Sequence, residues 1–384
     1  MRARAEPFGA WVRLDEPPAL VAIDKPLARR LRVLPNNAWD AGVLSPRPRP
    51  LEVHLSVTER CPVGCPGCYL DARPVGHHPS TEELRARLDA IDALGAFTVA
   101  FGGGEPLLRR DLGELARHAR RRGLVPVLTT SGVGLTQARV DELTSFAQIN
   151  VSYDGDDEIM NRSRGTDARA AERALSLLVA GGVRVGVNIV LTRHSFPALA
   201  RTVHEAIRRG ASEVQLLRFK PAGRAIGLRY LADRLESDQV AALPRVLEAL
   251  SLDAPVPLRI DCALVPFLVG DSVSPQRLAA WGVFGCEAGR NLAVLRADGT
   301  VSGCSFSPGS APAPLDEAAL AHPAVSRFTR HADALPEPCV SCAFRVVCRG
   351  GCRVVADHAG TPSAADPECP RVVAAQARGG SDAL

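Results

Sequence analysis

The segment LEVHLSVTERCPVGCPGCYL, residues 51–70, joins a strand-forming run to three closely spaced cysteines. Residues 51–58 (LEVHLSVT) are rich in apolar and β-branched side chains, which predicts a β-strand. Cys61, Cys65 and Cys68 follow it, separated by three and then two residues. A closed zinc site takes four ligands and a disulfide takes two. Three thiols therefore predict a metal site at the end of a strand that takes a further ligand from elsewhere.

This strand is the first of a regular alternation of strands and helices. Further strands are predicted at 96–103, 124–131, 148–155, 183–191 and 213–221. Helices are predicted from near Ser80, where Glu83 completes a capping box, and at 111–122, 136–146, 166–180 and 196–209. Apolar strands separated by helices are typical of a parallel sheet that curls into a barrel. We therefore expect an α/β fold, a partial (βα)6 TIM-like barrel, with its site at the carboxyl ends of the strands.

The composition of the chain changes on both sides of this unit. Residues 1–50 are short for a separate domain, and residues 10–24 resemble a hairpin that turns at the prolines. The predicted core spans 51–257, with helices around 231–250. Beyond residue 258 glycine, proline and cysteine increase, and eight of the 11 cysteines lie there. We expect a loop-rich domain at 258–375 that needs metal to fold, and a disordered tail at 376–384.

Composition and charge limit the location of the protein. The N-terminal residues lack the apolar run of a signal peptide, and no stretch is long enough to span a membrane. We therefore expect a cytoplasmic, reducing location, where 11 cysteines indicate metal or redox chemistry instead of disulfides. The net charge of +4 argues neither for nor against nucleic acid. Lys25 and Lys220 are the only lysines, which we interpret as an effect of genomic base composition.

Two polar motifs follow later strands of the predicted barrel. The segment FGGGEP, residues 101–106, ends the second strand, and its glycines permit close approach of the backbone to a ligand. Glu105 in this segment offers an anion to an ammonium group. The segment VSYDG, residues 151–155, ends the fourth strand and places Ser152 and Asp154 on one face. Both motifs would lie at the same edge of the sheet as the three cysteines.

The cysteine spacing, with the aromatic Tyr69 directly after the third cysteine, resembles the signature of the radical S-adenosylmethionine (radical SAM) enzymes. A [4Fe–4S] cube has four irons, so three thiols leave one iron open. The resemblance implies that the amino and carboxylate groups of S-adenosylmethionine occupy this open position. The fourth ligand would then be the cosubstrate.

The same resemblance implies roles for residues of the polar motifs. The segment with Gly103, Gly104 and Glu105 would contact the methionyl amine. A polar residue in the position of Ser152 would reach the ribose or methionyl part. Three more residues would belong to the same site: Arg164 at the carboxylate of S-adenosylmethionine, Asp154, and Asn188 on the fifth strand. Each residue also has a structural alternative. Glu105 would be a surface glutamate, and Ser152 and Asp154 would cap turns. Arg164 would be a solvated charge and Asn188 a strand-end amide.

The C-terminal cysteines resemble the SPASM extension of radical SAM enzymes. Twelve residues separate Cys286 from Gly299, and four more precede Cys304. The remaining cysteines of this pattern are Cys339, Cys342, Cys348, Cys352 and Cys369. The resemblance implies two auxiliary [4Fe–4S] clusters, three clusters in total. The outer one would use Cys339, Cys342, Cys348 and Cys369, and the inner one Cys286, Cys304 and Cys352.

The inner set is one thiol short, and Cys262 is the only spare cysteine. Cys262 is the fourth ligand, or a buried thiol, or the inner cluster is open and binds substrate. Zinc is the other hypothesis for this region, because Cys339-x2-Cys342 with Cys348-x3-Cys352 fits a zinc knuckle. The seven-cysteine pattern behind a radical SAM core favours iron and sulfur.

The resemblance implies an enzyme of the oxidoreductase type that cleaves S-adenosylmethionine to a 5′-deoxyadenosyl radical, which takes hydrogen from a substrate. A ribosomally made peptide is the leading substrate, modified by crosslinking, oxidation or epimerisation. The alternatives are a small molecule such as a porphyrin or cofactor precursor, and a zinc–cysteine interaction protein.

Expected partners are a ferredoxin or flavodoxin as reductant and a separate peptide-recognition protein, with no nucleic acid and no membrane. Ser305 stands where some sulfatase-maturing relatives carry an aspartate, which argues against that role. No catalytic residue is assigned.

Overall fold

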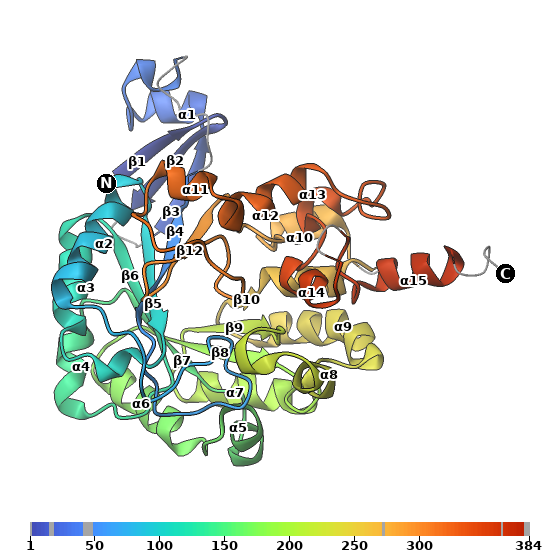
Figure 1. Ribbon diagram of the computed structural model, residues 1–384, viewed down its shortest axis with the longest axis horizontal. Coiled ribbons are helices and arrows are strands. Elements are labelled where there is room, and N and C mark those ends of the chain that lie inside the picture. The colour runs from blue at the N-terminus through green and yellow to red at the C-terminus, as the bar shows by residue number, and fades with distance from the viewer. Residues whose placement is uncertain (1, 15–18, 41–48, 271–272, 362–363, 380–384) are drawn as a thin grey trace.

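The computed structural model describes residues 2–14, 19–40, 49–270, 273–361 and 364–379. A curved sheet with helices on its outside forms the centre of the molecule (Figure 1). Six parallel strands follow one another in chain order across this sheet: β4 (Glu52–Thr58), β5 (Thr98–Gly103), β6 (Val125–Thr130), β7 (Gln148–Ser152), β8 (Val185–Leu191) and β9 (Glu213–Arg218). The predicted α/β partial barrel is confirmed, because each strand pairs with its neighbour in parallel register.

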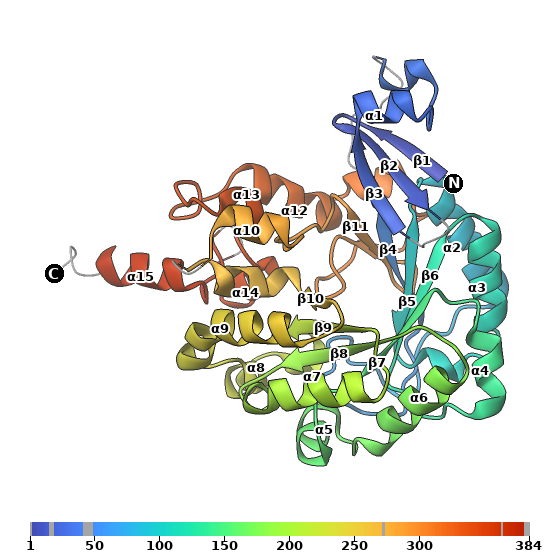
Figure 2. The ribbon, with the colours of Figure 1, turned by 180° about the vertical axis from the view of Figure 1, so that it is seen from behind.

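Helices cross between the strands and cover the outer face of the sheet (Figure 2). They are α2 (Thr81–Ala93), α3 (Leu112–Arg121), α4 (Gln137–Leu143), α6 (Arg169–Ala180) and α7 (Leu199–Arg208). The predicted capping box is present, since Ser80 and Glu83 exchange side-chain and backbone hydrogen bonds at the start of α2. The sequence did not predict α5 (Asp157–Arg164), whereas α8 (Leu228–Asp233) and α9 (Ser237–Asp253) correspond to the helices expected around 231–250.

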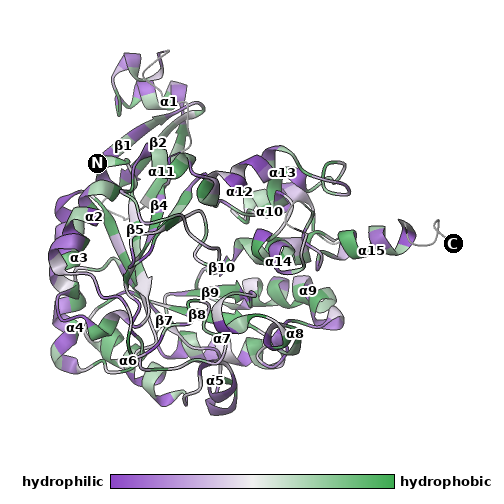
Figure 3. Ribbon diagram, in the orientation of Figure 1, coloured by the Kyte–Doolittle hydropathy of each residue, from purple (hydrophilic) through white to green (hydrophobic). Residues whose placement is uncertain are grey.

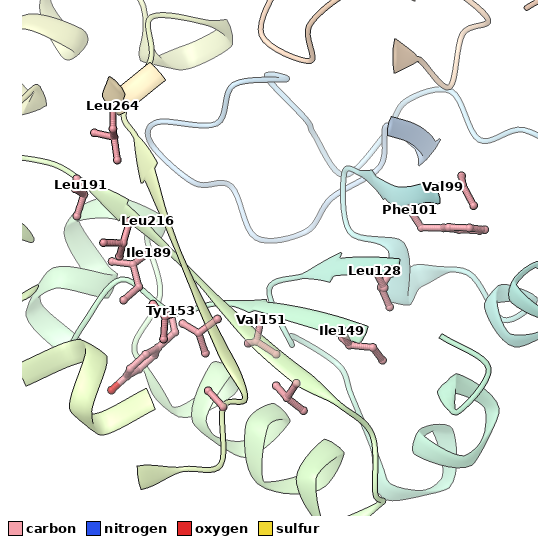
Figure 4. Packing of buried hydrophobic residues seen from close by; sticks show 14 of the residues in the cluster. Val99, Phe101, Leu128, Ile149, Val151, Tyr153, Ile189, Leu191, Leu216 and Leu264 are labelled. Carbon is pink, nitrogen blue, oxygen red and sulfur yellow. The ribbon is translucent and has the colours of Figure 1, made fainter. Parts of the chain in front are cut away.

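The main hydrophobic core lies between the sheet and these helices. Along β4 the alternate residues Val53, Leu55 and Val57 are at most 1% exposed. Leu84, Leu88 and Ile91 of α2 belong to the same core, at the spacing that brings side chains to one helix face. Figure 4 shows the corresponding packing on later strands, including Phe101, Leu128 and Ile149. The outer helix faces carry the hydrophilic residues (Figure 3). The side chains between these apolar residues point to the other face of the sheet, toward the barrel interior.

Two short strands from the cysteine-rich region extend the central sheet. Strand β11 (Leu292–Leu295) pairs in parallel with β4, and β12 (Val301–Ser302) pairs antiparallel with β11. At the opposite edge β10 (Leu258–Ile260) pairs in parallel with β9. Residues on both sides of the predicted boundary at 258 therefore share one sheet, and the division into domains stays a prediction.

The N-terminal segment is a small antiparallel sheet with its own core. Strands β1 (Arg2–Glu6), β2 (Gly9–Leu14) and β3 (Ala19–Asp24) pair in order and lead into α1 (Lys25–Arg30). The expected hairpin at 10–24 corresponds to β2 and β3, and its turn lies outside the described residues. The sequence analysis missed β1 and the cluster in which Ala10, Val12, Ala28, Ala38 and Trp39 pack together.

The cysteine-rich region contains loops and short helices: α10 (Pro275–Ala280), α11 (Glu317–Ala321), α12 (Pro323–Asp333), α13 (Arg345–Cys348), α14 (Arg353–His358) and α15 (Pro370–Gly379). Helix α15 corrects the expectation of a disordered tail from 376, because it begins at a proline and runs to Gly379; the residues after 379 lie outside the described part. Among the described residues, no helix is long and apolar enough to cross a membrane.

Candidate active site

The loop with Cys61, Cys65 and Cys68 follows β4 and is fixed from two sides. The backbone N–H of Cys61 donates to the carbonyl oxygen of Arg73 at 2.7 Å. Arg224, in the turn after β9, donates from its Nε to the carbonyl oxygen of Cys65 at 2.9 Å. Its backbone N–H donates to the carbonyl oxygen of Cys68, also at 2.9 Å. Backbone hydrogen bonds within the connection between β4 and α2, and from the turn after β9, therefore hold the cysteine loop in place.

Glycines bring neighbouring backbone segments against this loop. A Cβ on Gly104 would lie 2.1 Å from the carbonyl oxygen of Arg60, and one on Gly103 would lie 2.3 Å from that of Thr58. A Cβ on Gly223, which has a φ of +56°, would lie 2.4 Å from the carbonyl oxygen of Cys68. No larger residue fits these contacts without moving the backbone. The predicted segment at 103–104 therefore packs directly against the approach to the cysteine loop.

Glu105 is held by its own chain in this structure. Its Oε1 accepts from the backbone N–H of Leu107 at 3.0 Å and from the Thr130 hydroxyl at 2.6 Å. Its Oε2 accepts from the backbone N–H of Ser131 at 2.9 Å and from the Ser131 hydroxyl. A carboxylate offers about four lone-pair positions, and these four donors occupy them. Glu105 fixes the loop after β5, and its contact with a methionyl amine stays a prediction.

Arg164 and Asp154 form a two-point ion pair beside the thiols. The Arg164 Nε and Nη2 donate to the two Asp154 oxygens at 2.7 and 3.1 Å. The backbone N–H of Val190 also donates to Asp154, at 2.8 Å. Burial alone would lower the pKa of Arg164, but Asp154 and the nearby Cys65 raise it. The guanidinium therefore stays charged next to the loop, oriented by a buried carboxylate.

Asn188 and Ser152 are buried neighbours on adjacent strands. They are register partners on β8 and β7, 7% and 8% exposed. The Asn188 Oδ1 has no hydrogen-bond partner although it is buried. An unsatisfied buried acceptor is costly, so this atom fits a site where a ligand donates an amine or hydroxyl. The structure thus brings both predicted residues to one polar position.

A cavity of about 300 Å³ opens next to the cysteine loop. The end of β4 contributes Ser56 and Thr58 to its wall. The loop after the third cysteine contributes 70–73, and the turn between β11 and β12 contributes 296–298. Gly102 is the register partner of Ser56, and a Cβ on it would meet nothing within 4 Å. Space for a substrate therefore exists where the barrel and the cysteine-rich region meet.

Four C-terminal cysteines line one small cavity with Phe344 and Val269: Cys339, Cys342, Cys348 and Cys369. Burial raises the pKa of the Cys348 and Cys369 thiols, and it raises that of Cys339 to about 11. These four are the predicted outer set.

The predicted inner set gathers separately and includes Cys262. The Cys262 and Cys286 thiols are close enough to interact, and their interaction raises the pKa of Cys262 and lowers that of Cys286. Burial raises the pKa of Cys304 to about 12, and the charges of Cys286 and Cys352 act in the same direction. Four thiols are thus neighbours here, as in the outer set.

Among the described residues, no three His, Cys, Asp or Glu side chains are arranged to hold one metal ion.

Comparisons with known proteins agree with this geometry. A family model described as the radical SAM superfamily matches residues 55–205. A PqqA peptide cyclase from Ruegeria pomeroyi is 32% identical over 367 residues, 88% of this chain and 91% of that protein. One from Rhodopseudomonas palustris is 30% identical over 335 residues, 83% of this chain and 86% of that protein.

The chain belongs to the radical SAM superfamily. A crystal structure of Streptococcus suis SuiB bound to S-adenosylmethionine has the same fold, with a TM-score of 0.73 at 16% identity over 96% of this chain and 98% of that chain. Membership implies S-adenosylmethionine and one [4Fe–4S] cluster. The three thiols after β4, Arg164 and the unpaired Asn188 Oδ1 fit those two groups.

Sequence reasoning missed three contacts around the radical SAM site. The Tyr69 ring packs against Phe306 with centroids 4.5 Å apart, which joins the first cysteine loop to the segment after Cys304. The Ser305 hydroxyl and the His54 Nδ1 are 2.8 Å apart. Lys220 is buried beside Asp261. The sequence had singled out Tyr69, Ser305 and Lys220, but it gave no indication of their partners Phe306, His54 and Asp261.

Proposed function

We propose that this radical SAM enzyme modifies a ribosomally made peptide by an oxidative reaction such as crosslinking. The observation that carries the proposal is the three-thiol loop at the end of β4, which has the charged Arg164 near Cys65 and a cavity of about 300 Å³ lined by the residues that follow Cys68. The peptide is supported by relatives of 30–32% identity, along most of the chain, that are named PqqA peptide cyclases. No observation favours the small-molecule alternative.

The residues of the barrel bind and orient the reacting groups. When bound, the cluster and S-adenosylmethionine supply a 5′-deoxyadenosyl radical. Cys61, Cys65 and Cys68 would hold the cluster and leave one coordination position open. Arg164, held at two points by Asp154, would bind the carboxylate of the cosubstrate. Asn188 would accept from its amine or ribose hydroxyls.

We infer two auxiliary clusters in the cysteine-rich region. The four thiols around one cavity support the outer cluster. The contact between Cys262 and Cys286 supports an inner cluster with four ligands, Cys262, Cys286, Cys304 and Cys352. Each set then matches the four irons of a cube. These clusters would take up the electron that an oxidised substrate releases, or relay electrons to the first cluster.

The partners of the reaction follow from its chemistry. Reductive cleavage needs a one-electron donor, for which we propose a ferredoxin or flavodoxin in the cytoplasm. The peptide would be presented by a separate recognition protein, or it would bind directly. The N-terminal sheet is joined to the core by Arg4, whose Nη1 donates to the carbonyl oxygens of Pro50 and Gly95 at 3.1 and 3.0 Å. A peptide bound to the N-terminal sheet or to the core would thus be held at a defined distance from the barrel.

Anaerobic reconstitution tests the proposal. The protein is loaded with iron and sulfide and reduced, S-adenosylmethionine is added, and 5′-deoxyadenosine and iron per chain are measured. Formation of 5′-deoxyadenosine with about twelve irons, the total for three cubes, is expected. Zinc in place of iron, without 5′-deoxyadenosine, would overturn the proposal. With active enzyme, mass spectrometry of short peptides encoded beside the gene then identifies the substrate class.

A further inference from the structure

Lys220 is a buried cation, although the chain has only two lysines. It follows β9 and is 6% exposed, and its Nζ lies 2.5 Å from the Asp261 Oδ2. Asp261 is also buried, and the same oxygen accepts from the backbone N–H of Arg218 at 3.1 Å. A buried ammonium is costly without a partner, so the chain retains this pair against a penalty. The position of the Lys220–Asp261 pair indicates what it does.

The Lys220–Asp261 pair lies between the segments that carry the inner thiols. Asp261 directly precedes Cys262 and accepts from the backbone N–H of Ala263. On the other side the Lys220 Nζ lies 4.1 Å from the centroid of the Phe306 ring, two residues after Cys304. Phe219, the residue before Lys220, packs in the same small apolar cluster as Cys352 and Cys304. One cation thus adjoins three of the four inner thiol segments.

A charge in this position acts on the electron affinity of the group that the thiols hold. Inside a protein a fixed charge acts more strongly than in water, because the effective dielectric constant is lower. A nearby cation stabilises a cluster that has gained an electron, and a nearby anion destabilises it. The Lys220 Nζ lies 2.5 Å from the Asp261 Oδ2, so the ammonium and the carboxylate stabilise each other's charged forms.

We propose that Lys220 and Asp261 set the reduction potential of the inner auxiliary cluster in opposite directions, Lys220 raising it and Asp261 lowering it. The proposal rests on the inner cluster of the proposed function. The step is the uptake of one electron by the oxidised cluster from a chemical reductant, in which no bond breaks and no proton moves. The potential decides how readily the cluster accepts an electron from substrate.

A potentiometric titration followed by electron paramagnetic resonance tests the inference without a substrate. The full chain is used with Cys61, Cys65 and Cys68 replaced by alanine, so that only auxiliary clusters contribute. Dithionite is the reductant, and the inner signal is assigned by its loss in Cys304→Ala. Into this background we introduce Lys220→Gln, Asp261→Asn and Lys220→Arg, with Lys25→Gln as the control at the other lysine.

The expected shifts have opposite signs. Lys220→Gln lowers the inner potential, Asp261→Asn raises it, and Lys220→Arg and Lys25→Gln leave it close to that of the background. The outer potential changes less in every variant. Unchanged inner potentials in both neutralising variants overturn the proposal. Loss of about four irons from both also overturns it, because the pair then only supports the fold. A background protein without iron contradicts the proposed function instead.

Discussion

The barrel site and the cysteine-rich region hold their thiols in different ways. Cys61, Cys65 and Cys68 lie in one loop between a strand and a helix, and Arg164, at the end of the helix α5 that follows β7, lies near Cys65. The inner C-terminal group instead brings together thiols from segments about 90 residues apart, Cys262 and Cys352. Regular secondary structure positions the first site, whereas buried side-chain pairs position the second.

Buried ion pairs carry much of that second arrangement. Two residues at the end of β9, Arg218 and Lys220, reach into the cysteine-rich region at a spacing of two. Arg218 binds Asp366 at 2.6 Å and Glu368 at 2.8 Å, while Lys220 binds Asp261. Asp366 in turn accepts from the backbone N–H of Cys352 at 2.9 Å. Substitutions in the barrel site should therefore leave the cysteine-rich region intact. Substitutions in the buried ion pairs should affect both regions.

The largest expected effect is on the barrel site. Replacement of Cys61, Cys65 and Cys68 with alanine should abolish cleavage of S-adenosylmethionine, because no other thiol of the loop can hold the cluster. About eight irons should remain, those of two auxiliary cubes. Chromatography of 5′-deoxyadenosine and colorimetric iron measure the two quantities. Loss of all iron together would contradict the independence of the two regions.

Much of the barrel could be predicted from the sequence, because its signals are local. The β-branched run before Cys61 and the capping box at Ser80 and Glu83 are each complete within a few residues. The parallel order then follows from the alternation of strands and helices. Helix α5 was missed because it is short and interrupts this alternation after Asp156, its N-terminal cap.

The side-chain pairs could not be predicted, because their partners are distant in sequence. Arg218 and Asp366 are 148 residues apart, and Lys220 and Asp261 are 41 residues apart. Strand β11 pairs with β4 across more than two hundred residues and has only four residues of its own. For Glu105 the sequence showed a free anion, whereas four donors of nearby loops surround it. Each of these contacts depends on tertiary packing, which local sequence patterns do not reveal.

The second prediction concerns the link between the two regions. Arg218→Gln should reduce the free energy of unfolding by about 3–5 kcal/mol, because Asp366 and Glu368 would lose a buried partner. Anaerobic denaturation by urea, followed by circular dichroism, measures it. The control is Arg234→Gln, since Arg234 is 40% exposed and pairs with the same Glu368, and its effect should be below about 1 kcal/mol. Equal losses of unfolding free energy in the two variants would show that the buried Arg218 pairs stabilise the fold no more than the exposed Arg234 pair does.

A smaller effect is expected from the residue that orients Arg164. Asp154→Asn should weaken the binding of S-adenosylmethionine about tenfold, because the two-point ion pair loses its charge while the Arg164 guanidinium remains. Equilibrium dialysis with the reconstituted enzyme gives the dissociation constant, and iron content confirms that the cluster is intact. Asp167→Asn is the matched control, because Asp167 pairs with the exposed Arg169. An unchanged constant for Asp154→Asn would remove Arg164 from the cosubstrate site.

The smallest expected effect decides the role of Cys262. Its thiol interacts with that of Cys286 and lies at the start of the 3-10 helix Cys262–Leu268, so it can complete a set of four. If it is a ligand, Cys262→Ala should lower the iron content only slightly, because three thiols and the second cube remain, but it should change the paramagnetic spectrum of the inner cluster. Cys262→Ser offers a weaker oxygen ligand and should give an intermediate spectrum. Identical spectra for both variants and the unmodified protein would mean that Cys262 only packs against Cys286, and that the inner cluster keeps an open iron facing the barrel.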